Sequence, residues 1–557
     1  MRAALIILVG LTVSGCTSTG GFLAPDDAPQ SAYGSFLAGR YAGASRDLDA
    51  SSEYYAEALE QAPGSALITG RAFLASLMAG DFDRADDTAR AAAQGEDGAR
   101  LARLYLLAAD LAGGTVEPLQ GEPADPFGAM VASVIEDWKT VRGSRARALE
   151  AAETPGGGPF ALSGHLAVHR ALLFESARDY ERAEQAYRAA SGSIDLHDFT
   201  TVLYGEFLER RGRRADAIAL YQGRLAQTGE REDPEVAAAL DRVRNGRRAP
   251  RFPRAEEAAA RAIFAPSALL TSQAPVDYTA LYLRLVQRLD PDFARNTMAL
   301  GAMLEGLDLL DAAVEAYESL DRGAFAADAA VQAAWLEYRQ GRTGAALDRA
   351  RDLAAATRGE GPRLLLADML RASDRCEEAA EIYRAVHAER EAAGREVDWH
   401  VPYFAGLCLQ RTEGWAAAEP WLVAALDAAP DEPRVLNHLG YNWIVIGERV
   451  EEGFDLVARA AELAPENGAI LDSLGWGHFK QGRIEDAVLW LERAIERSPE
   501  DPTINWHLGD AYAASGRTLE ARFQWNRALE LDPDPREQAL LERRLEFGLS
   551  AGPADLE

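Results

Sequence analysis

The feature that most constrains this chain is a 34-residue period near its C-terminus. Pro465, Pro499 and Pro533 stand 34 residues apart, and Leu474-Gly475 and Leu508-Gly509 repeat at the same interval. A fixed period of this length is typical of repeat arrays, in which one unit is a single supersecondary element that cannot bury its apolar face alone. The sequence therefore predicts a stack of similar, well-formed units over residues 430–535.

Small and large residues recur within each unit at the places that two packed helices require. Glycine and alanine let the helices approach closely where they cross, and large apolar side chains fill the space between turns. In the last unit the small residues are Gly509, Ala521 and Ala528, and the large ones are Leu508, Tyr512 and Trp525. Gly516 permits the tight turn between the helices, because it has no Cβ. Each unit is predicted to be a pair of antiparallel helices.

Proline and aspartate mark where one unit ends and the next begins. Proline ends the second helix, because it lacks a backbone N–H and disfavours the helical conformation of the residue before it. Asp501-Pro502 and Asp534-Pro535 then place a capping aspartate before a first-turn proline. Residues 536–549 predict a capping helix, which covers the apolar face of the last unit.

Weaker copies of the pattern continue toward the N-terminus, and the abundant alanine, leucine, glutamate and arginine favour helices. The sequence predicts an all-α fold, a solenoid of stacked antiparallel helix pairs. Its expected segments are N-terminal repeats at 33–112, a loop at 113–128, degenerate repeats at 129–241, an Arg-rich loop at 242–254, further repeats at 255–429, the repeats at 430–535, the capping helix and a disordered tail at 550–557.

The first residues have the order of a secretory signal: the charge of Arg2, a short apolar stretch and a small-residue cleavage site. Val13-Ser14-Gly15-Cys16 resembles the bacterial lipobox, which implies a signal peptide at 1–15, lipidation of Cys16 and a flexible tether at 16–32. The alternatives are an ordinary signal peptide with an incidental cysteine, or an apolar N-terminal helix. Thr17 is not the aspartate that marks inner-membrane retention in enteric bacteria, which favours the periplasmic face of the outer membrane.

Charge and missing motifs exclude several classes of function. A formal net charge of −30 repels phosphate backbones, so nucleic acid is not an expected partner. No Gly-x-Ser-x-Gly, His-Glu-x-x-His or Gly-x-Gly-x-x-Gly motif occurs, and we expect no catalytic residues, metal or cofactor. Cys376 and Cys408 fall in neighbouring units. They are either two buried thiols or a disulfide, and both interpretations remain open at this point.

One basic segment stands out in this acidic chain, at residues 242–254. It is a solvated loop or a contact for an acidic partner, and the arginines that would make that contact are Arg244, Arg247, Arg248 and Arg251. Both interpretations remain open at this point.

The spacing of Leu-Gly, Ala, Ala and Pro resembles the tetratricopeptide repeat. The segments Val435–Tyr441, Asp472–Trp476, Ile504–Asp510 and Ala521–Trp525 are similar to those of a proteobacterial family of tetratricopeptide lipoproteins. One kind in that family is an outer-membrane adaptor of a periplasmic carboxyl-terminal processing protease that degrades cell-wall hydrolases. The resemblance implies a protein-binding adaptor without catalytic activity. The alternatives are a scaffold for another envelope machine, such as polysaccharide export or outer-membrane protein assembly, and a wall-directed enzyme.

The resemblance also implies a binding groove, because the first helix of each tetratricopeptide unit lines the concave face. The positions that point there are Asn437, Tyr441, Asp472, Trp476, Phe479, Lys480, Trp506 and Asp510. Aromatic residues beside a few polar groups suit the capture of peptides or proteins. The alternative is that Trp476 and Trp506 only pack between adjacent units.

Overall fold

The computed structural model describes residues 31–550, apart from 96–98, 114–125, 142–143, 154–165, 192–196, 229–232, 271–275, 357–358 and 396–397. In this part of the chain every regular element is a helix, and successive helices pair and stack. The predicted all-α solenoid is therefore confirmed. Cys16, the signal peptide, most of the tether and most of the 113–128 loop lie outside the described residues, as do residues 551–557.

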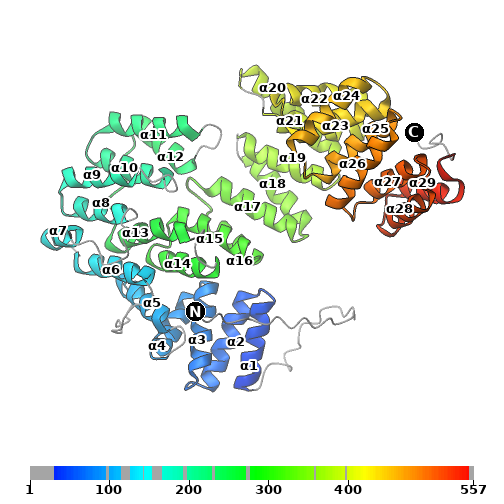
Figure 1. Cartoon of the computed structure of the whole chain (residues 1–557). Helices are drawn as coiled ribbons and strands as arrows, with labels where there is room; N and C mark the ends of the chain where they lie inside the picture. The colour runs from blue at the N-terminus through cyan, green and yellow to red at the C-terminus, as the bar shows by residue number, and fades with distance from the viewer. Residues whose placement is uncertain are drawn as a thin grey trace. The chain divides into compact units, whose positions relative to one another are not determined.

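The chain divides into two compact units, one ending at Arg342 and the other beginning at Thr343. The helices of the first unit (Figure 1) are α1 (Ala32–Ala44), α2 (Leu48–Gln61), α3 (Ala66–Ala79), α4 (Phe82–Ala92), α5 (Ala99–Leu111), α6 (Pro126–Val141), α7 (Arg145–Glu153), α8 (Leu166–Ser176), α9 (Tyr180–Ala190), α10 (His197–Arg210), α11 (Arg214–Thr228), α12 (Pro234–Arg244), α13 (Ala255–Leu270), α14 (Val276–Leu289), α15 (Ala294–Gly306), α16 (Leu310–Glu318) and α17 (Ala326–Arg339).

The second unit holds the strongest repeats. Its helices are α18 (Thr343–Ala356), α19 (Glu360–Ala372), α20 (Cys376–Ala392), α21 (His400–Thr412), α22 (Trp415–Ala428), α23 (Pro433–Ile446), α24 (Val450–Leu463), α25 (Gly468–Lys480), α26 (Ile484–Arg497), α27 (Pro502–Ala514), α28 (Thr518–Glu530) and α29 (Pro535–Phe547), followed by the short 3-10 turn η4 (Gly548–Ser550).

A close contact between a glycine and a large side chain occurs in six of the helix pairs. The glycine lies on the first helix and the large residue 16 positions later on the second, as in Gly39–Tyr55, Gly205–Tyr221, Gly301–Tyr317, Gly406–Leu422, Gly475–Leu491 and Gly509–Trp525. A Cβ added to Gly509 would lie 2.5 Å from Cδ1 of Trp525, too close for any side chain without movement. In the pair α23–α24 the approach is closer still, because a Cβ on Gly440 would lie 2.5 Å from the carbonyl oxygen of Gly453 and 2.9 Å from Val457. The interval between the glycine and the large residue in the sequence is therefore the interval at which the two helices of a pair touch.

The ends of the helices follow the predicted signals. Pro465, Pro499 and Pro533 lie just beyond the ends of α24, α26 and α28. Asp501 begins α27, and its carboxylate accepts hydrogen bonds from the backbone N–H groups of Thr503 and Ile504 at 2.9 and 3.1 Å. These bonds satisfy donors that the first turn of a helix cannot pair internally.

The first unit departs from a simple open stack, because α13 and α14 pack against helices far earlier in the chain. Helix α13 contacts α6 and α8, and α14 contacts α3 and α5. The guanidinium of Arg284 on α14 donates to the carbonyl oxygens of Met78 and Ala79 at 3.1 and 3.3 Å, at the end of α3. Arg288 forms an ion pair with Asp86 at 3.1 Å. In an ideal solenoid each repeat contacts only its neighbours, so this closure is an addition to the repeat pattern.

None of the described helices combines the length and the apolar character that a membrane crossing requires.

The glycine contact predicts that replacing two glycines of the same helix by alanine has different effects on stability. Gly301 and Gly306 both lie on α15, but a Cβ on Gly301 would lie 2.6 Å from Cε1 of Tyr317, whereas one on Gly306 would meet nothing within 4 Å. Gly301→Ala should destabilise the first unit by about 1–3 kcal/mol, because the helices must move apart. Gly306→Ala should be neutral or stabilising by up to about 1 kcal/mol. Urea unfolding followed by circular dichroism measures both, and equal midpoints for the two variants would contradict the prediction.

Candidate protein-binding site

An aromatic cluster joins α25 to α27 in the second unit. The ring of Trp476 stacks on Phe479 of its own helix with centroids 4.7 Å apart, and on His507 of α27 at 3.9 Å. Trp506 lies at the edge of the cluster, 5.9 Å from Trp476. Only 7% of Trp476 is exposed, so this side chain packs between adjacent repeats. Trp506 and Phe479 are half-buried and keep surface that a partner can reach.

Two carboxylates predicted for the groove are used inside the protein. Asp472 accepts a hydrogen bond from Nδ1 of His507 at 2.9 Å, and both groups are buried. Asp510, 1% exposed, accepts from Nε1 of Trp525 at 2.9 Å and from the guanidinium of Arg544 at 3.0 Å. It thereby connects α27 to its own partner α28 and to the last helix α29. Sequence position alone could not distinguish these inward carboxylates from exposed ones.

The other predicted groove residues stay accessible to different degrees. Asn437 and Tyr441 on α23 are half-buried, and Lys480 is exposed with its Nζ 5.5 Å from the centre of the Trp476 ring. Burial and the negative charge of Asp472 raise the pKa of the Tyr441 hydroxyl far above its usual range, so it stays protonated and can donate a hydrogen bond.

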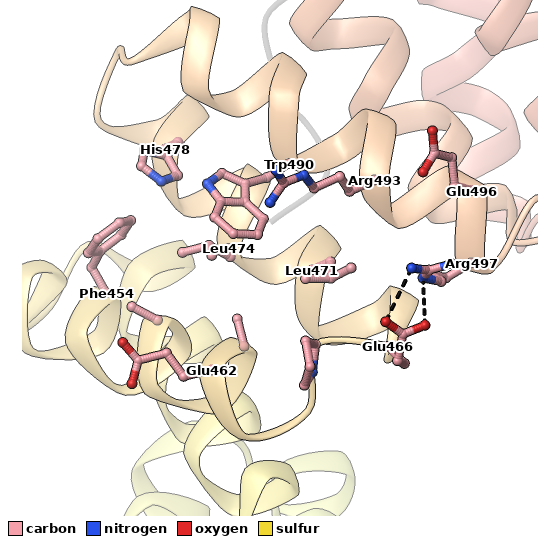
Figure 2. Close-up of a pocket in the computed structure, with 13 residues that line it drawn as sticks. Phe454, Glu462, Glu466, Leu471, Leu474, His478, Trp490, Arg493, Glu496 and Arg497 are labelled. Atoms are coloured by element: carbon pink, nitrogen blue, oxygen red, sulfur yellow. Dashed lines mark hydrogen bonds and ion pairs between the residues drawn. The ribbon is translucent and has the colours of Figure 1, made fainter.

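A pocket that the sequence did not reveal opens on the side of the second helices, between α24 and α26 (Figure 2). Its volume is about 700 Å³. Phe454 of α24 and Trp490 of α26 stand on opposite sides, and Leu471 and Leu474 of α25 form the apolar surface between them. His478 lies at one end, where burial, followed by the positive charge of Arg483, lowers its pKa. Both effects disfavour the protonated, positively charged form of this imidazole.

The rim of this pocket carries charges of both signs. Arg493 lies over the ring of Trp490 at 4.7 Å, and Arg483 lies over Phe454 at 4.3 Å. At the far end Arg497 pairs with Glu466 at 3.1 Å, shown by dashed lines in Figure 2. An apolar hollow with a charged rim can accept an aliphatic or aromatic side chain while the rim contacts polar groups beside it. The sequence feature that could have indicated this pocket is Trp490, a large aromatic residue directly before the buried Leu491 and on the outward side of α26.

The basic segment is partly neutralised by the protein itself. Arg251 pairs with Glu257 at 2.5 Å, and Arg254 pairs with the same carboxylate at 2.8 Å. Arg244, the last residue of α12, and Arg247 and Arg248 after it are exposed, and no carboxylate of the described residues pairs with them. Of the four arginines considered for an acidic partner, these three keep a free charge.

The described residues contain no group of three or more histidine, cysteine, aspartate and glutamate side chains placed to hold a metal ion.

Comparison with known proteins supports the repeat assignment. Residues 473–536 match the tetratricopeptide repeat family model. The TPR repeat-containing protein PA4667 of Pseudomonas aeruginosa is 32% identical over 94 residues, which are 17% of this chain and 16% of that protein. The match thus spans about a sixth of the curated relative. Residues 473–536 are therefore similar to tetratricopeptide repeats.

Several solved structures resemble parts of the chain at low similarity. A tetratricopeptide repeat protein from Parabacteroides merdae covers 45% of this chain and 97% of its own, with a TM-score of 0.37 and 14% identity. The Cut9–Hcn1 hetero-tetramer of the APC/C covers 92% of this chain and 95% of its own, with a TM-score of 0.38 and 13% identity. YrrB, described as a TPR protein with an unusual peptide-binding site, covers 33% of this chain and 92% of its own, with a TM-score of 0.27 and 19% identity.

The buried contact between Asp510 and Arg544 predicts how the last helix is held. Arg544→Ala should destabilise the second unit by about 3–5 kcal/mol, because it leaves the Asp510 carboxylate buried without its cation. Arg536→Ala, at an exposed position in the first turn of the same helix, is the matched control and should change stability by less than about 0.5 kcal/mol. Urea unfolding measures both variants. Equal unfolding midpoints would show that this ion pair does not fix α29.

Proposed function

We propose that the protein is a scaffold without catalytic activity, which binds a segment of another protein in the pocket between α24 and α26. The pocket itself carries the proposal: about 700 Å³ of apolar space, open to solvent, between Phe454 and Trp490. Tetratricopeptide repeats commonly bind other proteins, and the α26 side of this pocket lies within the residues that match that repeat. An apolar side chain of the partner would displace water from the hollow, which is the main favourable term in such binding.

The accessible part of the aromatic cluster supplies a second surface on the same unit. Phe479 and Trp506 offer apolar area, and Lys480 and Tyr441 offer hydrogen-bond donors beside it. A partner segment that used both surfaces would have to pass around the edge of the repeats, so each surface can be tested alone. The pocket is the more enclosed of the two and is the first to test.

The site of action that we propose is the periplasmic face of the outer membrane, with Cys16 as the lipidated residue. The order of Arg2, an apolar stretch and Val13-Ser14-Gly15-Cys16 supports this anchor. The partners that we propose are a periplasmic carboxyl-terminal processing protease and the cell-wall hydrolases that it degrades. The likeness of segments such as Val435–Tyr441 and Asp472–Trp476 to tetratricopeptide lipoproteins supports that choice.

The pocket predicts that one substitution removes most of the partner binding. Trp490→Ala should lower partner recovery from solubilised envelopes at least about tenfold, because buried aromatic anchors dominate binding energy. Leu489→Ala is the matched control, since Leu489 is exposed on the same helix and does not line the pocket. Quantitative mass spectrometry of the captured proteins, with circular dichroism to check folding, measures the effect.

The identity of the captured proteins separates the proposed roles. Recovery of a processing protease together with wall hydrolases supports the adaptor. Components of polysaccharide export or of outer-membrane protein assembly would replace it with a scaffold of that machine. Equal recovery by the Trp490→Ala protein and by the wild type would overturn the pocket as the binding site.

A further inference from the structure

We propose that Cys376 and Cys408 form a disulfide bond that ties α20 to α21. Their Sγ atoms lie 2.6 Å apart, and both side chains are buried. A disulfide bond is about 2.05 Å long, so a shift of roughly half an ångström closes the gap. The bond would join one repeat to the next within the second unit.

The short distance between the two Sγ atoms indicates a pair placed to form a bond, not two ordinary buried thiols. Carbon atoms in contact lie about 3.5–4.0 Å apart, and sulfur is larger than carbon. Two sulfurs at 2.6 Å are therefore pressed well inside an ordinary contact by the packing of α20 against α21. Buried cysteines that act only as small apolar residues have no need of this approach.

The surroundings decide which sulfur meets an oxidant first. Cys376 is the first residue of α20 and, at 5% exposed, lines a surface hollow of about 460 Å³. The other residues of this hollow carry charges of both signs, from Arg375 and Arg411 and from Asp374, Glu377 and Glu378. Cys408 is fully buried behind it, and burial raises the pKa of its thiol. We therefore assign Cys376 as the attacking residue and Cys408 as the resolving one.

The reaction is an exchange with a disulfide-bearing oxidant, such as oxidised glutathione or an oxidised protein dithiol. The thiolate of Cys376 attacks one sulfur of that oxidant, breaks its S–S bond and releases the first thiolate. Cys408 then loses its proton and attacks Sγ of Cys376, which releases the second thiolate. The two cysteines lose two electrons in total, the oxidant gains them, and the two protons end on the two released thiols.

The bond would act on the part of the unit that leads to the proposed binding surfaces. Gln410, on the same helix as Cys408, donates to Oδ1 of Asn442 and accepts from Nε2 of His438 on α23, each at 2.7 Å. The bond would fix the position of α21 against α20. Through the hydrogen bonds of Gln410, it would also restrict the movement of α23 relative to α21. Closing the loop from Cys376 to Cys408 would also restrict the unfolded chain and raise stability.

The test uses the full chain and needs no variant to be interpretable. The protein is incubated with oxidised glutathione, its free thiols are alkylated under denaturing conditions, and the digest is analysed by mass spectrometry without reduction. We expect a linked peptide pair containing Cys376 and Cys408, lighter by two hydrogens than the separate peptides. We also expect the melting temperature to rise by about 5 °C or more, and to return on reduction.

Variants then assign the effect to this pair. Cys376→Ser and Cys408→Ser, each compared with itself before and after oxidation, should show no rise in melting temperature. Cys16→Ser, which keeps both residues of the pair, should show the full rise. Alkylation of both Cys376 and Cys408 after prolonged oxidation would overturn the proposal. So would linkage of either residue to Cys16.

Discussion

A contact between a glycine of the first helix and a large side chain 16 residues later controls the packing of six helix pairs. It sets how closely the two helices of a pair approach, as Gly475 does with Leu491 and Gly509 with Trp525. Once that approach is fixed, the outer sides of each pair acquire a defined shape, and neighbouring pairs can stack on them. A side chain in place of the glycine would push the helices apart and change every later contact in the stack.

A second device joins successive pairs through buried carboxylates. An acidic residue on a first helix accepts a hydrogen bond from an aromatic residue of its own second helix and an ion pair from the following first helix. Examples within the described residues are Glu175–Tyr187–Arg210, Glu209–Tyr221–Arg242 and Asp510–Trp525–Arg544. The carboxylates are buried, so each needs its full set of partners. The same geometry thus serves degenerate repeats in one unit and the final helix in the other.

The local parts of the fold could be predicted from the sequence, and the long-range parts could not. Gly509 with Trp525, the capping Asp501 and the terminating Pro499 each act within one unit, so their spacing reveals them. The packing of α14 on α3 depends on Arg284 bonding to backbone carbonyls, which every residue type supplies, and no pattern marks it. Asp510 and Trp476 were placed on the right helices, but their burial depends on how far successive repeats rotate, which the period does not encode.

The pocket follows from the same rotation. Among the first helices, α23 contacts α25 and α25 contacts α27. The pocket lies between the second helices α24 and α26. Gly477 permits the close approach of α25 to the preceding helix pair, since a Cβ there would lie 3.2 Å from Ile444 of α23 and 3.2 Å from Phe454 of α24. When the first helices of successive pairs approach closely, their second helices are left further apart. Apolar residues that face this gap, such as Trp490, remain partly exposed. Contiguous exposed apolar surface commonly marks a site of contact with another protein, which is why we propose that a partner binds on this open side of the stack.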